Sequence, residues 1–285
     1  ALHFDGDLWT LFRLQAQPEV TITNYVGRSV NVEILPTFIS DKILAGTVYS
    51  TNRTGLPSNF SDVCVEGSGK VWLGLDSGQI IWCQNFSATN RSWGAETAAD
   101  GLSPGRSPIM LARRGGELWV GYASESAFLN VFDGQKWSSI SLRGVGIAEN
   151  CGGLVETRDG AVWLAGRYSV GVYRKGRWTR YEKPAVPIPL ARNFIFESSD
   201  GAIWIGGPNT EIVRLDYETP RWRMYHGLNF QWESPGGAEW FLSSEGRVVL
   251  HETNRWFSLG PEDGLPDAPV ALVGTRTGEI WVAGS

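Results

Sequence analysis

The sequence predicts an all-β protein built from repeated units, and three observations carry this prediction. No segment keeps apolar residues at helical spacing for three turns. Short runs of β-branched and aromatic residues alternate with glycine-containing turns, as strands and hairpins do. A tryptophan with apolar neighbours recurs at intervals of 36 to 47 residues between Trp72 and Trp281. A period near 40 residues made of short strands is typical of a four-stranded β-propeller blade.

The recurring unit is a glycine turn followed by a strand with tryptophan at its second or third position. It is found at residues 69–74, 116–121, 159–166, 200–206, 237–242 and 278–284. A second tryptophan series follows a tight Asp-Gly or Lys-Gly hairpin turn, which favours positive φ. We therefore expect four strands per blade, A to D, with tryptophan on B packing between blades and tryptophan on D sealing the outer edge. These structural tryptophans are Trp9, Trp72, Trp93, Trp119, Trp137, Trp163, Trp178, Trp204, Trp222, Trp240, Trp256 and Trp281.

The two ends of the chain are predicted to complete one blade between them. Residues 2–9 match residues 130–137, which belong to strands C and D, and the chain ends just after a strand B. A closing blade formed by residues 1–12 and 267–285 removes the free sheet edges that invite aggregation. The interval from Trp9 to Trp72 is one blade too long, so residues 13–52 are expected to form a divergent blade with strands near 20–25, 30–35 and 43–49.

The predicted fold is thus a single domain over residues 1–285, a seven-bladed β-propeller of four-stranded antiparallel blades. The ring is closed by the N-terminal strands C and D pairing with the C-terminal strands A and B. Six blades with an insertion is the alternative.

Composition excludes several classes of function. The chain has 25 basic and 30 acidic residues and a formal charge of -5, which argues against a nucleic-acid partner. It has no run of eighteen apolar residues that would span a membrane and no signal segment at its start. Cys64, Cys83 and Cys151 form no metal-binding pattern, so neither metal nor other cofactor is expected, and whether Cys64 pairs with Cys83 stays open. The Asp-Gly pairs at 159–160 and 200–201 are interpreted as turn residues rather than calcium ligands.

The linker and strand motifs resemble a known repeat. Residues 55–59 read G-L-P-S-N and lead through an apolar strand to G-K-V-W-L-G at 69–74; residues 263–266 with 278–282 and residues 192–206 are further copies. This pattern is similar to the two-component regulator propeller repeat, and the resemblance covers the chain except residues 13–52. It implies a periplasmic or extracellular sensor domain of a membrane-bound histidine kinase or related signalling protein, and some such sensors are thought to bind oligosaccharides. The family's immunoglobulin-like domain, membrane segment and kinase domain do not occur in this chain.

A propeller gathers its D-to-A links and B-to-C loops on one face around the central channel, where rigid strands hold variable loops. Arg, Asn and Tyr side chains on that face suit a small polar or anionic ligand or an oligosaccharide. Asp76 and Asp267 lie in these loops as well. The candidate ligand-binding residues are Asn59, Arg106, Asn150, Arg192, Asn193, His226 and Asn229 on D-to-A links, and Tyr122, Arg167, Tyr168 and Asn209 on B-to-C loops.

The leading hypothesis is an extracytoplasmic sensor propeller of a bacterial signalling protein. Its partners would be the ligand, a membrane-spanning signalling region of the same parent protein and, in a homodimer, a second copy. A stand-alone lectin or interaction scaffold is the first alternative. A polysaccharide lyase or hydrolase is the second; it would need an acid and a base across the channel mouth, such as His226 with Arg192 or Tyr168. The sequence favours binding over catalysis, because it contains no catalytic motif.

Overall fold

The computed structural model describes residues 2–4, 9–12, 20–26, 29–35, 60–85, 92–123, 128–144, 146–147, 151–166, 169–182, 194–206, 211–216, 221–275 and 279–284. The chain divides into two compact units, Ala1–Ser141 and Leu142–Ser285, and each is described by itself.

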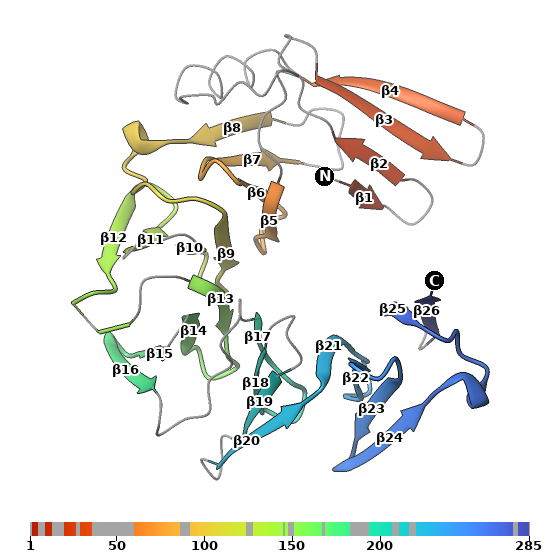
Figure 1. The fold of residues 1–285 in the computed structure, drawn as a ribbon. Helices are drawn as coiled ribbons and strands as arrows, with labels where there is room; N and C mark the ends of the chain where they lie inside the picture. Colours follow the sequence, from red (N-terminus) through yellow and green to blue (C-terminus); the bar gives the residue numbers. More distant parts are fainter. Residues whose placement is uncertain are drawn as a thin grey trace. The chain divides into compact units, whose positions relative to one another are not determined.

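The first unit contains three four-stranded antiparallel sheets in which strands follow one another in chain order (Figure 1). The strands of the first sheet are β1 (Leu2–Phe4), β2 (Trp9–Phe12), β3 (Val20–Val26) and β4 (Ser29–Leu35). Those of the second are β5 (Phe60–Val65), β6 (Val71–Leu75), β7 (Ile80–Gln84) and β8 (Ser92–Glu96). Those of the third are β9 (Pro108–Ala112), β10 (Leu118–Tyr122), β11 (Phe128–Phe132) and β12 (Trp137–Ser141).

The second unit repeats this arrangement in three four-stranded sheets and ends in a two-stranded one. Its first two sheets consist of β13 (Cys151–Glu156), β14 (Val162–Gly166), β15 (Ser169–Arg174) and β16 (Arg177–Glu182), then β17 (Phe194–Glu197), β18 (Ile203–Gly206), β19 (Glu211–Asp216) and β20 (Arg221–His226). The others consist of β21 (Leu228–Glu233), β22 (Glu239–Ser243), β23 (Val248–Glu252) and β24 (Arg255–Leu259), then β25 (Pro269–Gly274) and β26 (Ile280–Gly284).

Helix is confined, in the described residues, to two three-residue 3-10 turns, η1 (Ala98–Asp100) and η2 (Pro261–Asp263). The segments that the structure describes include no helix with the length and apolarity that crossing a bilayer requires. The predicted all-β class and the four-stranded antiparallel sheets are confirmed.

The sheet at the start of the chain differs from the expected one. β2 pairs with β3, Trp9 opposite Tyr25, so residues 2–35 form a single sheet instead of sharing their strands between a closing blade and a divergent blade. β25 and β26 form a sheet of two, and the described sheets contain no closing blade. Strands adjacent in sequence pair readily because a short link closes at small entropic cost, a preference that tryptophan spacing does not report. The expected strand near 43–49 lies outside the described residues.

The turns between strands A and B share one backbone geometry. In the β13–β14 turn, the Thr157 N–H donates to the Ala161 carbonyl at 2.9 Å, and Gly160 has a φ of 79°. The Asp159 carboxylate accepts the Ala161 N–H at 3.1 Å. The same bonds recur around Asp200 and Gly201, so both Asp-Gly pairs have a local hydrogen-bonding role in their turns.

The core is formed where the strand-B tryptophan of one sheet meets the next sheet. Trp163 is 1% exposed and packs among Ile195, Ile203 and Ile205, with Trp222 beside the cluster. Every strand-B tryptophan lies on the predicted strand, from Trp72 on β6 to Trp281 on β26, and five of the six expected on D lie on the fourth strands β8, β12, β16, β20 and β24. The sixth, Trp9, lies instead on β2, the second strand of its sheet. The tryptophan repeat therefore marks the sheet-to-sheet contacts.

Candidate functional site

The structure describes four of the eleven candidate ligand-binding residues. Arg106 is exposed on the link between β8 and β9, and Tyr122 is the last residue of β10. His226 and Asn229 lie on β20 and β21. Seven lie outside the described residues: Asn59, Asn150, Arg167, Tyr168, Arg192, Asn193 and Asn209.

The link between β20 and β21 is shorter than expected. His226 was expected in a D-to-A link, but it ends β20, and Asn229 belongs to β21, which leaves Gly227 as the whole link. His226 is exposed, and its Nδ1 lies 3.6 Å from the Glu211 carboxylate. The hydrogen-bond ladder of the sheets extends to both positions, since His226 pairs with Glu211 and Asn229 with Leu242.

A cavity of about 200 Å³ opens on the loop edge of the first unit, where the B-to-C turns and the D-to-A links lie. Its lining comes from the β6–β7 turn, including Ser77 and Gly78, and from residues 96–98 and 102–105 of the following link. Asp76 accepts a hydrogen bond from the Ser107 hydroxyl at 3.2 Å, while the Ala123 N–H donates to the Ser107 carbonyl at 3.1 Å. Residues 103–107 are thus held between the ends of two neighbouring sheets, and Arg106 lies within this segment.

A buried polar cluster holds the link between β8 and β9 in place through hydrogen bonds to Ser103. Asn130 is fully buried; its Oδ1 accepts the Ser103 N–H at 3.1 Å and the Ser139 hydroxyl at 2.9 Å. The Tyr122 hydroxyl donates to the Ser103 carbonyl at 3.0 Å and accepts from Asn130 Nδ2 at 3.3 Å. Burial raises the pKa of Tyr122, against the opposing effect of the Asn130 hydrogen bond. Tyr122 therefore anchors the link that carries Arg106, with its ring buried and its hydroxyl engaged.

Replacing Asn130 by leucine is expected to cost about 1–3 kcal/mol of stability, because the Ser103 N–H loses its acceptor. Asn229→Leu, a change of the same size on half-buried β21, is expected to cost less than about 0.5 kcal/mol. Urea unfolding of both variants measures the difference. Equal losses would show that the cluster does not hold the link.

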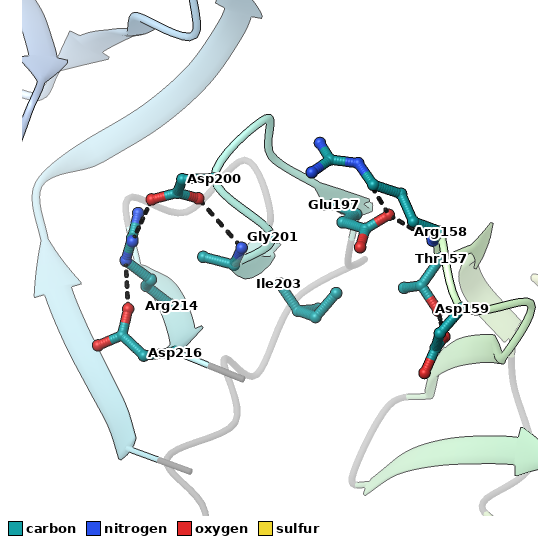
Figure 2. Close-up of a pocket in the computed structure, with 10 residues that line it drawn as sticks. Thr157, Arg158, Asp159, Glu197, Asp200, Gly201, Ile203, Arg214 and Asp216 are labelled. Carbon is teal, nitrogen blue, oxygen red and sulfur yellow. Dashed lines mark hydrogen bonds and ion pairs between the residues drawn. The ribbon is translucent and has the colours of Figure 1, made fainter. Parts of the chain in front are cut away.

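A larger cavity, of about 380 Å³, lies in the second unit (Figure 2). It is found at the turn edge, by which we mean the edge of a sheet where the A-to-B and C-to-D turns lie. It is bounded by the β13–β14 turn, with Thr157, Arg158 and Asp159, and by the β17–β18 turn with Asp200 and Gly201. Its remaining lining is Glu197, Ala202, Ile203, Arg214 and Asp216. In the described residues no group of three His, Cys, Asp or Glu side chains is placed to hold a metal ion.

The polar groups of this cavity connect neighbouring turns. The Arg158 N–H donates to the Glu197 carboxylate at 2.8 Å, and the Arg158 guanidinium donates to the Ser198 and Ser199 carbonyls at 2.8 and 2.7 Å. One sheet further, the Ser199 N–H donates in the same way to Glu233 at 2.6 Å. The β13–β14 turn and the β17–β18 turn are therefore each hydrogen-bonded to strand A of the next sheet.

Three residues that line the cavity, Asp200, Arg214 and Asp216, also belong to a network of charged side chains. The Arg214 guanidinium donates to Asp200 at 2.5 Å and to Asp216 at 2.8 Å, and its Nη1 lies 3.5 Å from Glu239 on the next sheet. Burial raises the pKa of Asp200, but hydrogen bonds from Ser198 and Arg214 outweigh it, so the pKa lies below its ordinary value. The network thus keeps Asp200 ionised at neutral pH.

Glu239 is the centre of this network. It is 2% exposed, accepts the Trp204 indole N–H at 2.7 Å and contacts His251 Nδ1. The His251 ring is buried and packs against Trp256, with ring centroids 4.3 Å apart and ring planes inclined by 33°. Glu239 and His251 are directly paired on β22 and β23, where the preceding sheet pairs Ile203 with Leu215. A polar, hydrogen-bonded pair here replaces an apolar pair.

Sequence reasoning missed this network, although a signal was present. The residue before the strand-B tryptophan is apolar in every other copy, for example Val162 and Ile203, and only Glu239 departs from that pattern. Aligning the repeats column by column would have singled it out. Cys64, Cys83 and Cys151 are not joined in disulfides, and burial raises the pKa of Cys64 to about 12.

Comparison with known proteins supports the fold. No family model and no curated protein matches the sequence. The structure of YCF48 bound to D1 peptide matches with TM-score 0.57 and 13% identity, over 98% of this chain and 86% of that one. A chain of the mitotic checkpoint complex matches with TM-score 0.57 and 13% identity, over 98% of this chain and 83% of that one.

A third match is the extracellular domain of the putative one-component system BT4673 from B. thetaiotaomicron. It has TM-score 0.57 and 13% identity, and it covers 99% of this chain and 38% of that one. The chain therefore spans well under half the length of this extracellular domain. At such identities the likeness shows the fold alone, a β-propeller.

Proposed function

We propose that this chain is the ligand-binding propeller of an extracytoplasmic bacterial sensor, which binds a small polar ligand or a saccharide unit at its loop edge. The observation that carries the proposal is the cavity of about 200 Å³ between the β6–β7 turn and the link that bears Arg106. Its size suits one sugar ring or a small anion, and the neighbouring guanidinium supplies bidentate hydrogen bonds. The likeness to an extracellular domain of a one-component system supports a sensor role. A membrane-spanning region of the parent protein, and a homodimer, would transmit binding.

The proposal includes a seven-bladed ring, with one blade for each of the seven described sheets and a blade that covers the face of β25 and β26. Trp281 on β26 is 66% exposed, whereas Trp163 and Trp204, at the same strand position, are at most 1% exposed because the next sheet covers them. Val273, which is paired with Trp281, is exposed as well. An apolar face of this kind needs a covering blade.

A thermal-shift screen against oligosaccharides and small anions tests the site. A ligand at a hundred times its Kd stabilises the folded state by about 2.7 kcal/mol, which corresponds to a rise in Tm of about 5 °C for a chain of this size. Arg106→Ala is expected to abolish the rise, while Arg114→Ala, which removes an exposed arginine from the β9–β10 turn, is expected to keep it. A ligand that stabilises both variants equally would refute this placement.

A stand-alone interaction scaffold is the second candidate. It is favoured by the match to YCF48 bound to D1 peptide, and by the outer strand β24, where Trp256 and Phe257 are exposed. A peptide that binds through β24 would leave the Arg106→Ala variant unaffected. For the lyase or hydrolase alternative, two of the three named residues, Arg192 and Tyr168, lie outside the described residues, so that alternative gains no support.

A further inference from the structure

The ammonium group of Lys70 lies inside an aromatic enclosure at the turn edge of the first unit. Its Nζ is 3.8 Å from the Trp72 ring centroid, 4.3 Å from that of Trp82 and 5.7 Å from that of Phe132. The Trp72 ring is inclined by 63° to Trp82 and by 69° to Phe132, so the three rings form walls rather than a stack. We call these three residues the ammonium cage.

Two carboxylates complete the electrostatics of the cage. Glu66 accepts the Trp72 indole N–H at 2.5 Å, and Glu96 accepts the indole N–H groups of Trp82 and Trp137 at 2.9 and 3.1 Å. These bonds fix the rings and place two negative charges near the cation. In the described part of the chain, the Lys70 ammonium has no hydrogen bond or ion pair, only the ring faces. A cage that holds a cation without hydrogen bonds fits an alkylated ammonium best.

Lysine itself is a poor match to this enclosure. Burial lowers the pKa of Lys70, although Glu66 and Glu96 act in the opposite direction. A primary ammonium is compact and strongly hydrated, so it loses more on leaving water than a quaternary ammonium, which has no N–H groups and a permanent charge. The cage therefore favours an alkylated cation over the group that it holds.

Packing of the strand-B tryptophan does not require the lysine. Ala161 occupies the equivalent position before Trp163, and that tryptophan is 1% exposed without a long side chain at this position.

We propose that the ammonium cage is a binding site for a quaternary or N-methylated ammonium group, and that Lys70 occupies it as an intramolecular competitor. The cation site differs from the proposed loop-edge site, since its ligand would contact the rings of Trp72, Trp82 and Phe132, none of which lines the loop-edge cavity; Glu96 borders both sites. The ligand class of the cation site is a small organic cation, whereas the loop edge would take a polar or anionic ligand.

Calorimetric titration with tetramethylammonium chloride, against sodium chloride at equal ionic strength, tests the proposal. Lys70→Ala is expected to bind tetramethylammonium at least ten times more tightly than the unaltered protein. The matched variant Lys136→Ala, which removes an exposed lysine from the β11–β12 turn, is expected to behave like the unaltered protein. Adding Phe132→Leu to Lys70→Ala is expected to weaken binding about ten-fold.

A folded Lys70→Ala protein that does not distinguish tetramethylammonium from sodium would overturn the proposal, as would equal affinity with and without the lysine. A second measurement uses the unaltered protein and needs no variant to fold. Under limited acetylation by acetic anhydride, tetramethylammonium is expected to raise modification of Lys70 relative to Lys136, because the displaced amine becomes accessible. An unchanged ratio of the two by mass spectrometry would contradict displacement.

Discussion

His251→Leu is expected to lower the free energy of unfolding by about 3–5 kcal/mol, because it leaves the buried Glu239 carboxylate without its contact to the His251 ring. Glu239 is 2% exposed, so water cannot replace the lost contact. Arg214 Nη1 remains at 3.5 Å, a distance beyond a good hydrogen bond. Glu239→Ile is expected to cost a similar amount. It leaves the buried His251 ring without its hydrogen-bond partner and removes the acceptor of the Trp204 indole N–H.

The double variant Glu239→Ile/His251→Leu is expected to lie within about 2 kcal/mol of the unaltered protein. It rebuilds the apolar pair formed by Ile203 and Leu215 one sheet earlier, and the remaining cost is the unsatisfied Trp204 N–H. Urea unfolding of the two single variants and the double variant completes a thermodynamic cycle. If the losses simply added, the two residues would not act as a pair.

The strand order of most sheets could be predicted from the sequence because one residue type marks it. A tryptophan on strand B must be covered by the next sheet, and the glycine turn before it fixes where the strand begins, as at Gly160 and Trp163. Residues 2–35 lack this regularity, so spacing could count their strands but could not decide which strands pair. The pairing of β2 with β3 depends on which residues face each other across the two strands, and the spacing of the tryptophans carries no information on that.

The candidate sites were predictable to different degrees. The loop edge follows from topology, and a cavity on that edge lies beside Arg106, on a predicted link. The role of Tyr122 did not follow, because its anchoring contact is with Asn130, a side chain on another strand. The ammonium cage was beyond sequence reasoning for the same reason: Phe132 reaches Lys70 from the neighbouring sheet.

Gly78→Ala is expected to destabilise the protein by about 3–5 kcal/mol, through positive φ and a collision with backbone. Gly78 has a φ of 93°, and a Cβ there would lie 1.8 Å from the Gly105 carbonyl oxygen. Gly69 occupies the same place in an A-to-B turn, with a φ of 82° and nothing within 4 Å of its Cβ position. Gly69→Ala therefore carries the conformational cost alone, about 1–2 kcal/mol.

The difference between these two glycine variants measures how closely the link approaches the β6–β7 turn. Urea unfolding is expected to separate them by about 2 kcal/mol, the part that belongs to the collision. The Gly105 carbonyl directly precedes Arg106, so moving it also displaces the guanidinium that the loop-edge ligand would contact. A loop-edge ligand should thus stabilise Gly69→Ala but not Gly78→Ala. Equal stability losses, or equal ligand responses, would mean that the link does not rest on this turn.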